Sequence, residues 1–206
     1  MKKVLSVMMV CLLLILGACS STPSVNRISP GTLVDLSGRW NDSDVRMVCE
    51  SLISDCLNSP QVAQFVEQYS SRNGGRLPAC LVGNFKNDSS EHIDTSIITI
   101  NMEGVIVRSG KLDFVAGGGT RQEIRTERQD QQEYASEATA SALGYEIGAA
   151  LLLTGSVKSM VDRAGNTTVR SYFVNAEMTN IETNTRIWMG NNNEIKKVIR
   201  QSNYRF

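Results

Sequence analysis

Residues 89–94 contain the densest group of side chains that could carry out acid–base chemistry. Ser90, Glu91, His92 and Asp94 are close neighbours, and His92 is the only histidine in the chain. A histidine can act as a general base near neutral pH. A catalytic triad, however, brings its members together from separate parts of the chain around an oxyanion hole. We therefore predict a polar recognition loop, held by turn and cap hydrogen bonds, and no catalytic site.

A second polar stretch, QEIRTERQDQQE, covers residues 122–133, where Ile124 is the only large apolar residue. Alternating charges of this kind are typical of a solvated helix with charge pairs four residues apart. The alternative is a polar surface that docks another protein. In that case Arg125 and Arg128 are the residues that we expect to contact the partner.

Other patterns point away from nucleotides and metals. Three glycines at 117–119 stand between a predicted strand and a predicted helix, where a phosphate could bind. Neither a P-loop lysine nor a GxGxxG pattern accompanies them, so a turn that needs positive φ explains them better. The cysteine spacing and the single histidine give no zinc pattern. We expect no cofactor, no metal and no small-molecule substrate.

The N-terminus is typical of a bacterial lipoprotein signal. A charged start, MKK, precedes an apolar run at 4–16 that is too short to span a bilayer, and the lipobox LGAC ends at Cys19. The Cys19 thiol then takes a diacylglycerol, and the freed amine can take a third acyl chain such as palmitate, which gives a stable membrane anchor. Because Ser20 rather than aspartate follows, we expect the outer membrane, with the protein facing the periplasm.

Three cysteines remain once Cys11 in the signal and Cys19 are set apart. Cys49 and Cys56 lie on one predicted helix, roughly 10 Å apart along its axis, which is too far for a mutual disulfide. One of them can pair with Cys80 in an oxidising periplasm. The alternative is three buried thiols that act as small apolar residues.

The charge of the chain excludes a class of partners. Basic and acidic residues balance at 21 each, and loss of Lys2 and Lys3 with the signal leaves 19 basic residues, a net charge of about −2. Such a chain offers no electrostatic attraction to nucleic acid.

Residues 78–117 form the centre of the predicted fold. An apolar run at 80–85 predicts a buried strand, and 112–116 predicts another. Between them, 95–109 predicts a helix, because one face carries apolar residues at helical spacing; these are Ile98, Met102, Val105 and Ile106. Gly110 ends this helix. The result is a βαβ unit, whose two strands should be parallel.

The flanking segments predict further helices. A stripe of seven apolar residues predicts a helix at 43–57 that faces the core; these are Val45, Val48, Cys49, Leu52, Ile53, Cys56 and Leu57. A shorter helix follows Pro60. Thr120 and Glu123 predict a capping box for a helix at 121–133. A further helix at 136–148 should turn Ala140, Leu143 and Ile147 inward.

The last third of the chain predicts a β-meander. Residues 150–157 form a buried strand, 168–181 alternate as a second strand, and 186–195 return as a third. The fold class is therefore α/β, with a mixed sheet of about five strands and helices packed on it. We expect a signal peptide at 1–18, a lipidated tether at 19–37 and a single domain at 38–206.

Several stretches together resemble the LpoB-type penicillin-binding protein activator lipoproteins, in order along residues 37–200; these are LVGNFKNDSSEHIDT, SGKLDFVA, RQEIRTERQDQQEYAS, LGYEIGAALLLTGSV and NIETNTRIWMG, besides the lipobox. The resemblance implies a fold like the N-terminal domain of TolB. It also implies an outer-membrane lipoprotein that stimulates a bifunctional penicillin-binding protein and has no enzymatic activity of its own.

One feature departs from the resembled family, whose best-known members carry a long proline-rich stalk. Here the predicted tether is short, and the amphipathic helix at 43–57 stands where a stalk would run. This leaves an alternative function open: a structural lipoprotein of envelope assembly or secretion.

Overall fold

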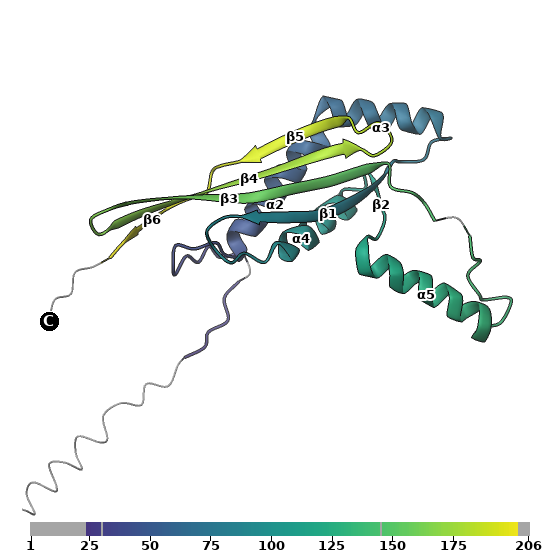
Figure 1. The fold of residues 1–206 in the computed structure, drawn as a ribbon, viewed down its shortest axis with the longest axis horizontal. Helices are drawn as coiled ribbons and strands as arrows, with labels where there is room; N and C mark the ends of the chain where they lie inside the picture. Colours follow the sequence, from purple (N-terminus) through teal and green to yellow (C-terminus); the bar gives the residue numbers. More distant parts are fainter. Residues whose placement is uncertain (1–23, 30, 145, 202–206) are drawn as a thin grey trace, which may run out of the picture. The chain divides into compact units, whose positions relative to one another are not determined.

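The computed structural model describes residues 24–29, 31–144 and 146–201 (Figure 1). The predicted signal peptide and Cys19 lie outside the described residues. The chain divides into two units after Thr32, and all the described helices and strands belong to the second. No helix among the described residues combines the length and the apolar character that crossing a membrane requires.

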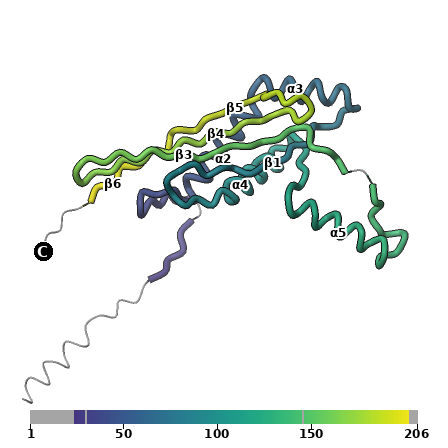
Figure 2. Tube along the Cα trace, in the orientation of Figure 1, coloured from purple at the N-terminus to yellow at the C-terminus, as the bar shows by residue number. Residues whose placement is uncertain are grey.

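The described chain contains four helices and six strands, and its last four elements are all strands (Figure 2). In order they are α2 (Asp42–Asn58), α3 (Pro60–Arg72), β1 (Ala79–Asp88), α4 (Thr95–Ser109), β2 (Asp113–Phe114), α5 (Gly118–Tyr134), β3 (Leu151–Ala164), β4 (Thr167–Asn180), β5 (Arg186–Asn192) and β6 (Lys196–Arg200). The predicted helix at 95–109 is confirmed at both ends, with the Asp94 side chain as N-cap and Gly110 in the left-handed conformation after the last turn.

The strands form one mixed sheet in the order β2-β1-β3-β4-β5. β1 runs parallel to β2 and to β3, whereas β4 is antiparallel to β3, β5 and β6. The predicted parallel βαβ unit and the mixed α/β sheet are confirmed. The described residues form six strands rather than about five, because β5 pairs only Val174–Thr179 of the long strand β4. The chain then continues in the same direction as β6, which pairs with the other half of β4.

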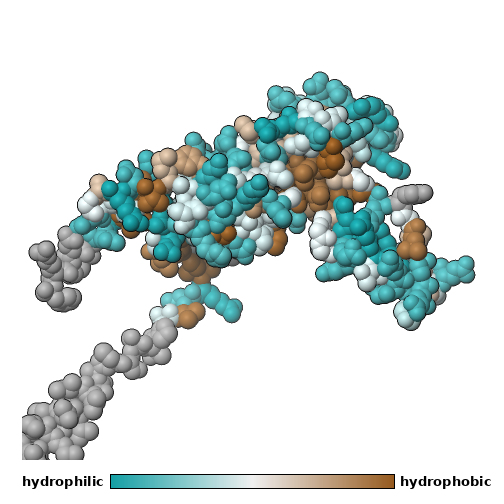
Figure 3. All heavy atoms as spheres, in the orientation of Figure 1, coloured by the Kyte–Doolittle hydropathy of each residue, from teal (hydrophilic) through white to brown (hydrophobic). Residues whose placement is uncertain are grey.

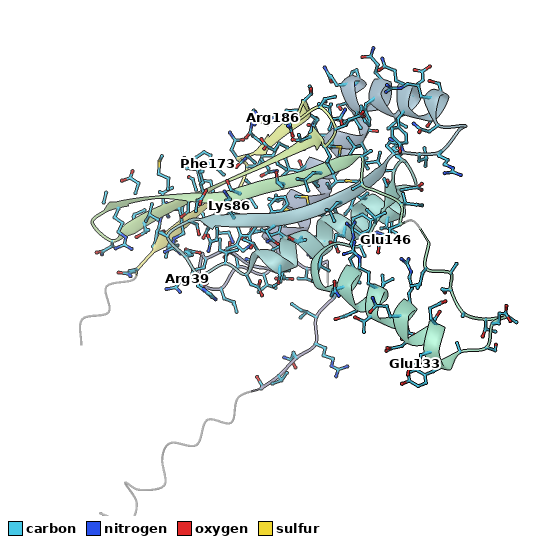
Figure 4. All side chains as sticks on the ribbon, turned by 45° about the vertical axis from the view of Figure 1, so that its right-hand side comes forward. Arg39, Lys86, Glu133, Glu146, Phe173 and Arg186 are labelled. Carbon is cyan, nitrogen blue, oxygen red and sulfur yellow. The ribbon has the colours of Figure 1, made fainter. Side chains whose placement is uncertain are left out.

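The core lies between the sheet and two helices, with α4 against β1 and α2 against β5 (Figure 1). All seven apolar residues of the predicted stripe on α2 are buried. Leu52 is 2% exposed and Ile53 is 0% exposed, which confirms that this face meets the core. On β4, Tyr172 and Val174 turn inward, whereas Phe173 between them lies on the open face of the sheet together with Lys86 of β1 (Figure 4).

The three cysteines of the domain are free and buried. They therefore act as small apolar residues, and the alternative of a disulfide to Cys80 is not realised. Burial raises the pKa of the Cys49 thiol to about 12 and that of Cys80 to about 12, and it also raises the pKa of Cys56. These thiols are protonated at neutral pH and so are poor nucleophiles.

The predicted capping box at the start of α5 is wrong. The helix begins at Gly118, its N-cap is Gly117, and the N-cap makes no side-chain hydrogen bond. Thr120 consequently lies inside the first turn and cannot act as the N-cap residue. A Cβ at Gly117 would lie 2.5 Å from Cδ1 of Leu81, so a larger residue there would require the end of that side chain to move.

The predicted helix at 136–148 is absent from the described residues of that stretch. Leu143 and Ile147, which were expected to face inward, are each 65% exposed. A short helix is marginal unless it buries an apolar face, and Gly144 lowers its stability further. Here the segment runs back along α5, whose one large aliphatic side chain, Ile124, is too little to cover such a face.

Candidate partner-binding surfaces

The loop at 89–94 connects β1 to α4 and is ordered by its own polar side chains. The Asn87 side-chain oxygen Oδ1 accepts hydrogen bonds from the Ser89 backbone N–H at 3.0 Å and from the Ser89 hydroxyl at 2.6 Å. The Asn87 side-chain nitrogen Nδ2 donates to the Glu91 backbone carbonyl at 2.8 Å. At the other end Asp94 caps α4, and its bonds from Ser96 lower the pKa of the Asp94 carboxyl. The loop therefore has a defined shape on a rigid support.

Glu91 is the inward-facing member of this loop. Its side chain is 11% exposed and forms an ion pair with Arg170, which is 13% exposed. The other carboxylate oxygen accepts hydrogen bonds from the Tyr172 hydroxyl at 2.9 Å and from the Trp40 backbone N–H at 3.3 Å. Burial and this bond to Glu91 raise the pKa of Tyr172. Glu91 thus ties the loop to β4 and to the segment before α2.

The remaining predicted residues of the loop face solvent. Ser90, His92 and Asp94 are exposed, and the Ser90 backbone N–H donates to the Ser159 hydroxyl on β3 at 3.0 Å. The structure therefore separates Glu91, which holds the loop, from the three residues that the loop presents. Exposed polar side chains on a loop that is held in one conformation are suited to recognition of another molecule.

The second surface lies on α5, which contains no buried residue. No Cα atom of α5 lies within 8 Å of another described helix or strand. In the space-filling view its surface is mostly hydrophilic (Figure 3). The helix is joined to the segment that follows it by side chains: the Gln132 amide donates to the Ser141 carbonyl at 2.8 Å, and Gln131 accepts from the Ser141 N–H at 2.9 Å.

Three arginines on one face of α5 converge on Glu146. Arg125 donates two hydrogen bonds, from Nε at 2.8 Å and from Nη2 at 3.0 Å. The Arg128 Nη1 lies 3.4 Å from the same carboxylate, and the Arg121 Nε lies 3.9 Å away. The pKa of Glu146 is lowered, chiefly by the hydrogen bond from Arg125, and the pKa of Arg125 is raised by the same bond.

A shallow pocket of about 260 Å³ adjoins this cluster. Its wall includes Arg121, Arg128 and Glu146, and its apolar part comes from Phe114, Val115, Ala116, Ile124 and Ile147. The Arg121 Nε donates to the Ala116 carbonyl at 2.9 Å, which fixes one edge of the pocket.

The sequence pointed to Arg125 and Arg128 as candidate binding residues, but it did not point to Arg121 and Glu146, the other two members of this charged cluster. Glu146 lies 18 to 25 positions from the arginines, so no helical spacing links them. The available signal was composition: Glu146 is the only charged residue in the otherwise apolar stretch LGYEIGAALLL at 143–153. A carboxylate in such a stretch calls for a partner.

A stable sheet that presents a shaped loop and an arginine-lined helix has the features of a protein-binding domain. Comparison with protein families gives a match over residues 44–194 to the family described as peptidoglycan-synthase activator LpoB. The chain belongs to this family. A comparison with curated protein sequences gives no significant match.

Solved structures similar to the chain include domains of the same family. The LpoB C-terminal domain from Salmonella enterica is 16% identical, with 66% of this chain and 93% of that one covered and a TM-score of 0.33. The corresponding Escherichia coli domain is 16% identical, with 60% and 83% covered and a TM-score of 0.35. The solution structure of Escherichia coli LpoB is 15% identical, with 90% and 85% covered and a TM-score of 0.39.

Proposed function

We propose that the protein is an outer-membrane lipoprotein that binds and activates a bifunctional penicillin-binding protein and so regulates peptidoglycan synthesis. The observation that carries this proposal is the family match, because it covers most of the domain and its description is that of a peptidoglycan-synthase activator. The protein acts by binding rather than by chemistry of its own. The loop at 89–94 and the arginine face of α5 are the surfaces proposed to meet the synthase.

Activation is tested directly with purified components. The bifunctional penicillin-binding protein of the same organism is assayed for glycan polymerisation and cross-linking, with and without this protein. We expect both rates to rise with added protein and to saturate. If neither rate changes and no complex forms in a pull-down, the proposal is wrong, and the alternative of an envelope-assembly lipoprotein gains ground.

The membrane anchor is proposed to be the lipid on Cys19, after removal of residues 1–18. Replacing Cys19 by Ala removes the thiol that accepts the diacylglycerol, so we expect unprocessed precursor and no incorporation of labelled palmitate. Separation of the inner and outer membranes, followed by detection of the protein in each fraction, tests whether it resides in the outer membrane. Equal palmitate labelling of the Cys19→Ala variant would contradict the anchor.

The length of the proposed tether limits how far the domain can reach. Contacts with the domain begin before residue 37: Asn41 donates to the Val34 carbonyl at 3.2 Å, and Asp35 pairs with Lys197 at 3.1 Å. The stretch at 20–33 spans at most about 50 Å when fully extended. An average coil of this length is much shorter.

Reach is therefore tested by changing this length. Deleting part of 20–33 should weaken growth and peptidoglycan synthesis in a strain that depends on the protein, whereas inserting flexible residues there should be tolerated. If the shortened variant works as well as the natural one, the protein acts close to the outer membrane, and the partner must itself extend toward it.

A further inference from the structure

The arginine face of α5 has more positive charge than its internal partner neutralises. Arg121, Arg125 and Arg128 stand at i, i+4 and i+7 and share the single carboxylate of Glu146. Their side chains are 29%, 49% and 32% exposed. Each guanidinium has five N–H donors and no acceptor, so most donors of this cluster remain available for further anionic acceptors.

The rest of α5 limits what that acceptor can be. Four acidic residues lie on the same helix, namely Glu123, Glu127, Asp130 and Glu133. The helix as a whole is therefore slightly acidic, and a broad anionic surface such as a bilayer would be repelled by most of it. A narrow acidic segment that follows the arginine stripe alone avoids this repulsion.

The adjoining pocket is partly apolar, so a partner that fills it should supply an apolar side chain. Ile124 lies between the arginines and is 40% exposed, and Ile147 beside Glu146 is 65% exposed. Large apolar side chains left open next to paired charges are typical of a docking surface, in which an apolar anchor is ringed by polar contacts. The pocket is large enough for one apolar side chain of a partner.

From this charge complementarity we propose that the α5 arginine face binds an acidic peptide segment of the synthase, in which an apolar residue is flanked by Glu or Asp. The apolar side chain enters the pocket beside Ile124, and the flanking carboxylates pair with Arg125 and Arg128. Glu146 occupies the position of one of these carboxylates in the free protein and competes with the partner. The inference rests on the proposed function for the identity of the partner.

Because Glu146 competes with the partner, replacing an arginine and replacing Glu146 should change the affinity for the synthase in opposite directions. Arg125→Glu removes the bidentate donor and adds a repelling charge, so affinity for the synthase should fall about tenfold or more. Glu146→Gln removes the internal competitor and leaves the arginines free, so affinity should rise severalfold. If the cluster serves only to hold α5 against the segment that contains Glu146, both variants should bind the synthase more weakly.

Binding of full-length, detergent-solubilised protein to the immobilised synthase tests these signs. Arg72→Glu on α3 is the matched control, because it makes the same charge change at an exposed arginine outside the stripe and should leave affinity unchanged. The denaturation midpoint of each variant confirms folding. Raising the salt concentration should weaken binding of the natural protein more than that of Arg125→Glu.

Two soluble probes separate the outcomes. A fluorescent peptide of alternating Glu and Leu residues should bind the natural protein and lose affinity for Arg125→Glu, and vesicles containing phosphatidylglycerol should not bind. If the synthase binds natural protein and Arg125→Glu equally, the inference is wrong while the proposed function stands. If the natural protein does not bind the synthase, the proposed function fails, and the peptide alone decides: no peptide binding, or vesicle binding in its place, overturns the acidic-segment surface.

Discussion

Helices α4 and α5 are of similar length, 15 and 17 residues, and are held in opposite ways. α4 buries Ile98, Met102 and Ile106 completely, whereas α5 buries nothing. α4 is fixed by apolar contacts that burial makes strong, at roughly 1.5–3 kcal/mol for each large side chain. α5 is fixed by exposed ion pairs and amide hydrogen bonds, which are individually weak.

The difference separates what keeps the domain folded from what is free to bind. A helix that supplies core side chains cannot turn them to a partner without unfolding the domain. A helix held by exposed charges can exchange them for a partner's charges at little cost. On this argument α4 and α2 carry stability, and α5 is the helix proposed to bind the partner.

The largest effect should come from matched isoleucine replacements on the two helices. Ile98→Ala opens a cavity in the core and should lower the free energy of unfolding by roughly 2–5 kcal/mol. Ile124→Ala on α5 should change it by less than about 0.5 kcal/mol. Chemical denaturation followed by circular dichroism measures both. Equal losses would show that α5 is part of the folding core and would remove the contrast.

The same contrast can be drawn with two glutamates. Glu91→Gln leaves Arg170 in a largely buried position without its counter-charge, so we expect a loss of roughly 3 kcal/mol. Glu146→Gln should leave the denaturation midpoint unchanged, because its arginine partners remain solvated. Thermal and urea denaturation of the two variants provide the comparison. If the midpoint falls as far for Glu146→Gln as for Glu91→Gln, then Glu146 contributes to the stability of the domain, and its arginine partners are not free to exchange it for a partner's carboxylate.

The core was predictable from sequence because apolar spacing decides it. The bounds of α4 and the seven buried residues of α2 follow from periodicity, since a stripe of that width has to be covered. Gly110 gave the end of α4 through its left-handed conformation. The sixth strand was missed, because pairing of β6 with one half of β4 depends on how far β5 extends, which no local pattern encodes.

The α5 region was predictable only in part. Its polarity predicted that α5 would be largely solvated, and the helix buries no residue. That Arg125 and Arg128 contact the partner stays a prediction. The helix expected at 136–148 failed because apolar residues at helical spacing predict a helix only if something covers them. The paired hydrogen bonds between Arg125 and Glu146 join residues 21 positions apart, and they form because an irregular segment brings Glu146 back to α5. Such contacts depend on the three-dimensional fold alone.

The smallest expected effect concerns pH and is confined to α5. The pKa of Glu146 is lowered from its ordinary value of 4.5, chiefly by the hydrogen bond from Arg125. A carboxyl whose pKa is lower when paired stabilises its contact above the unpaired pKa and loses that contribution as the pH falls through the lower, paired value. The contact between α5 and Glu146 should therefore be complete at neutral pH and released at acidic pH below 4.5.

Amide hydrogen exchange, corrected for its intrinsic pH dependence, measures this release. Amides of α5 near Arg125 should lose their remaining protection on acidification, while those of α4 near Met102 keep theirs, because apolar burial does not titrate. Glu146→Gln should abolish the pH dependence in α5, whereas Glu127→Gln, on the same helix and outside the arginine cluster, should retain it. If protection in α5 is unchanged on acidification, Glu146 does not hold the helix. The arginines would then be unpaired in solution, and Glu146 would offer no competition to an acidic partner.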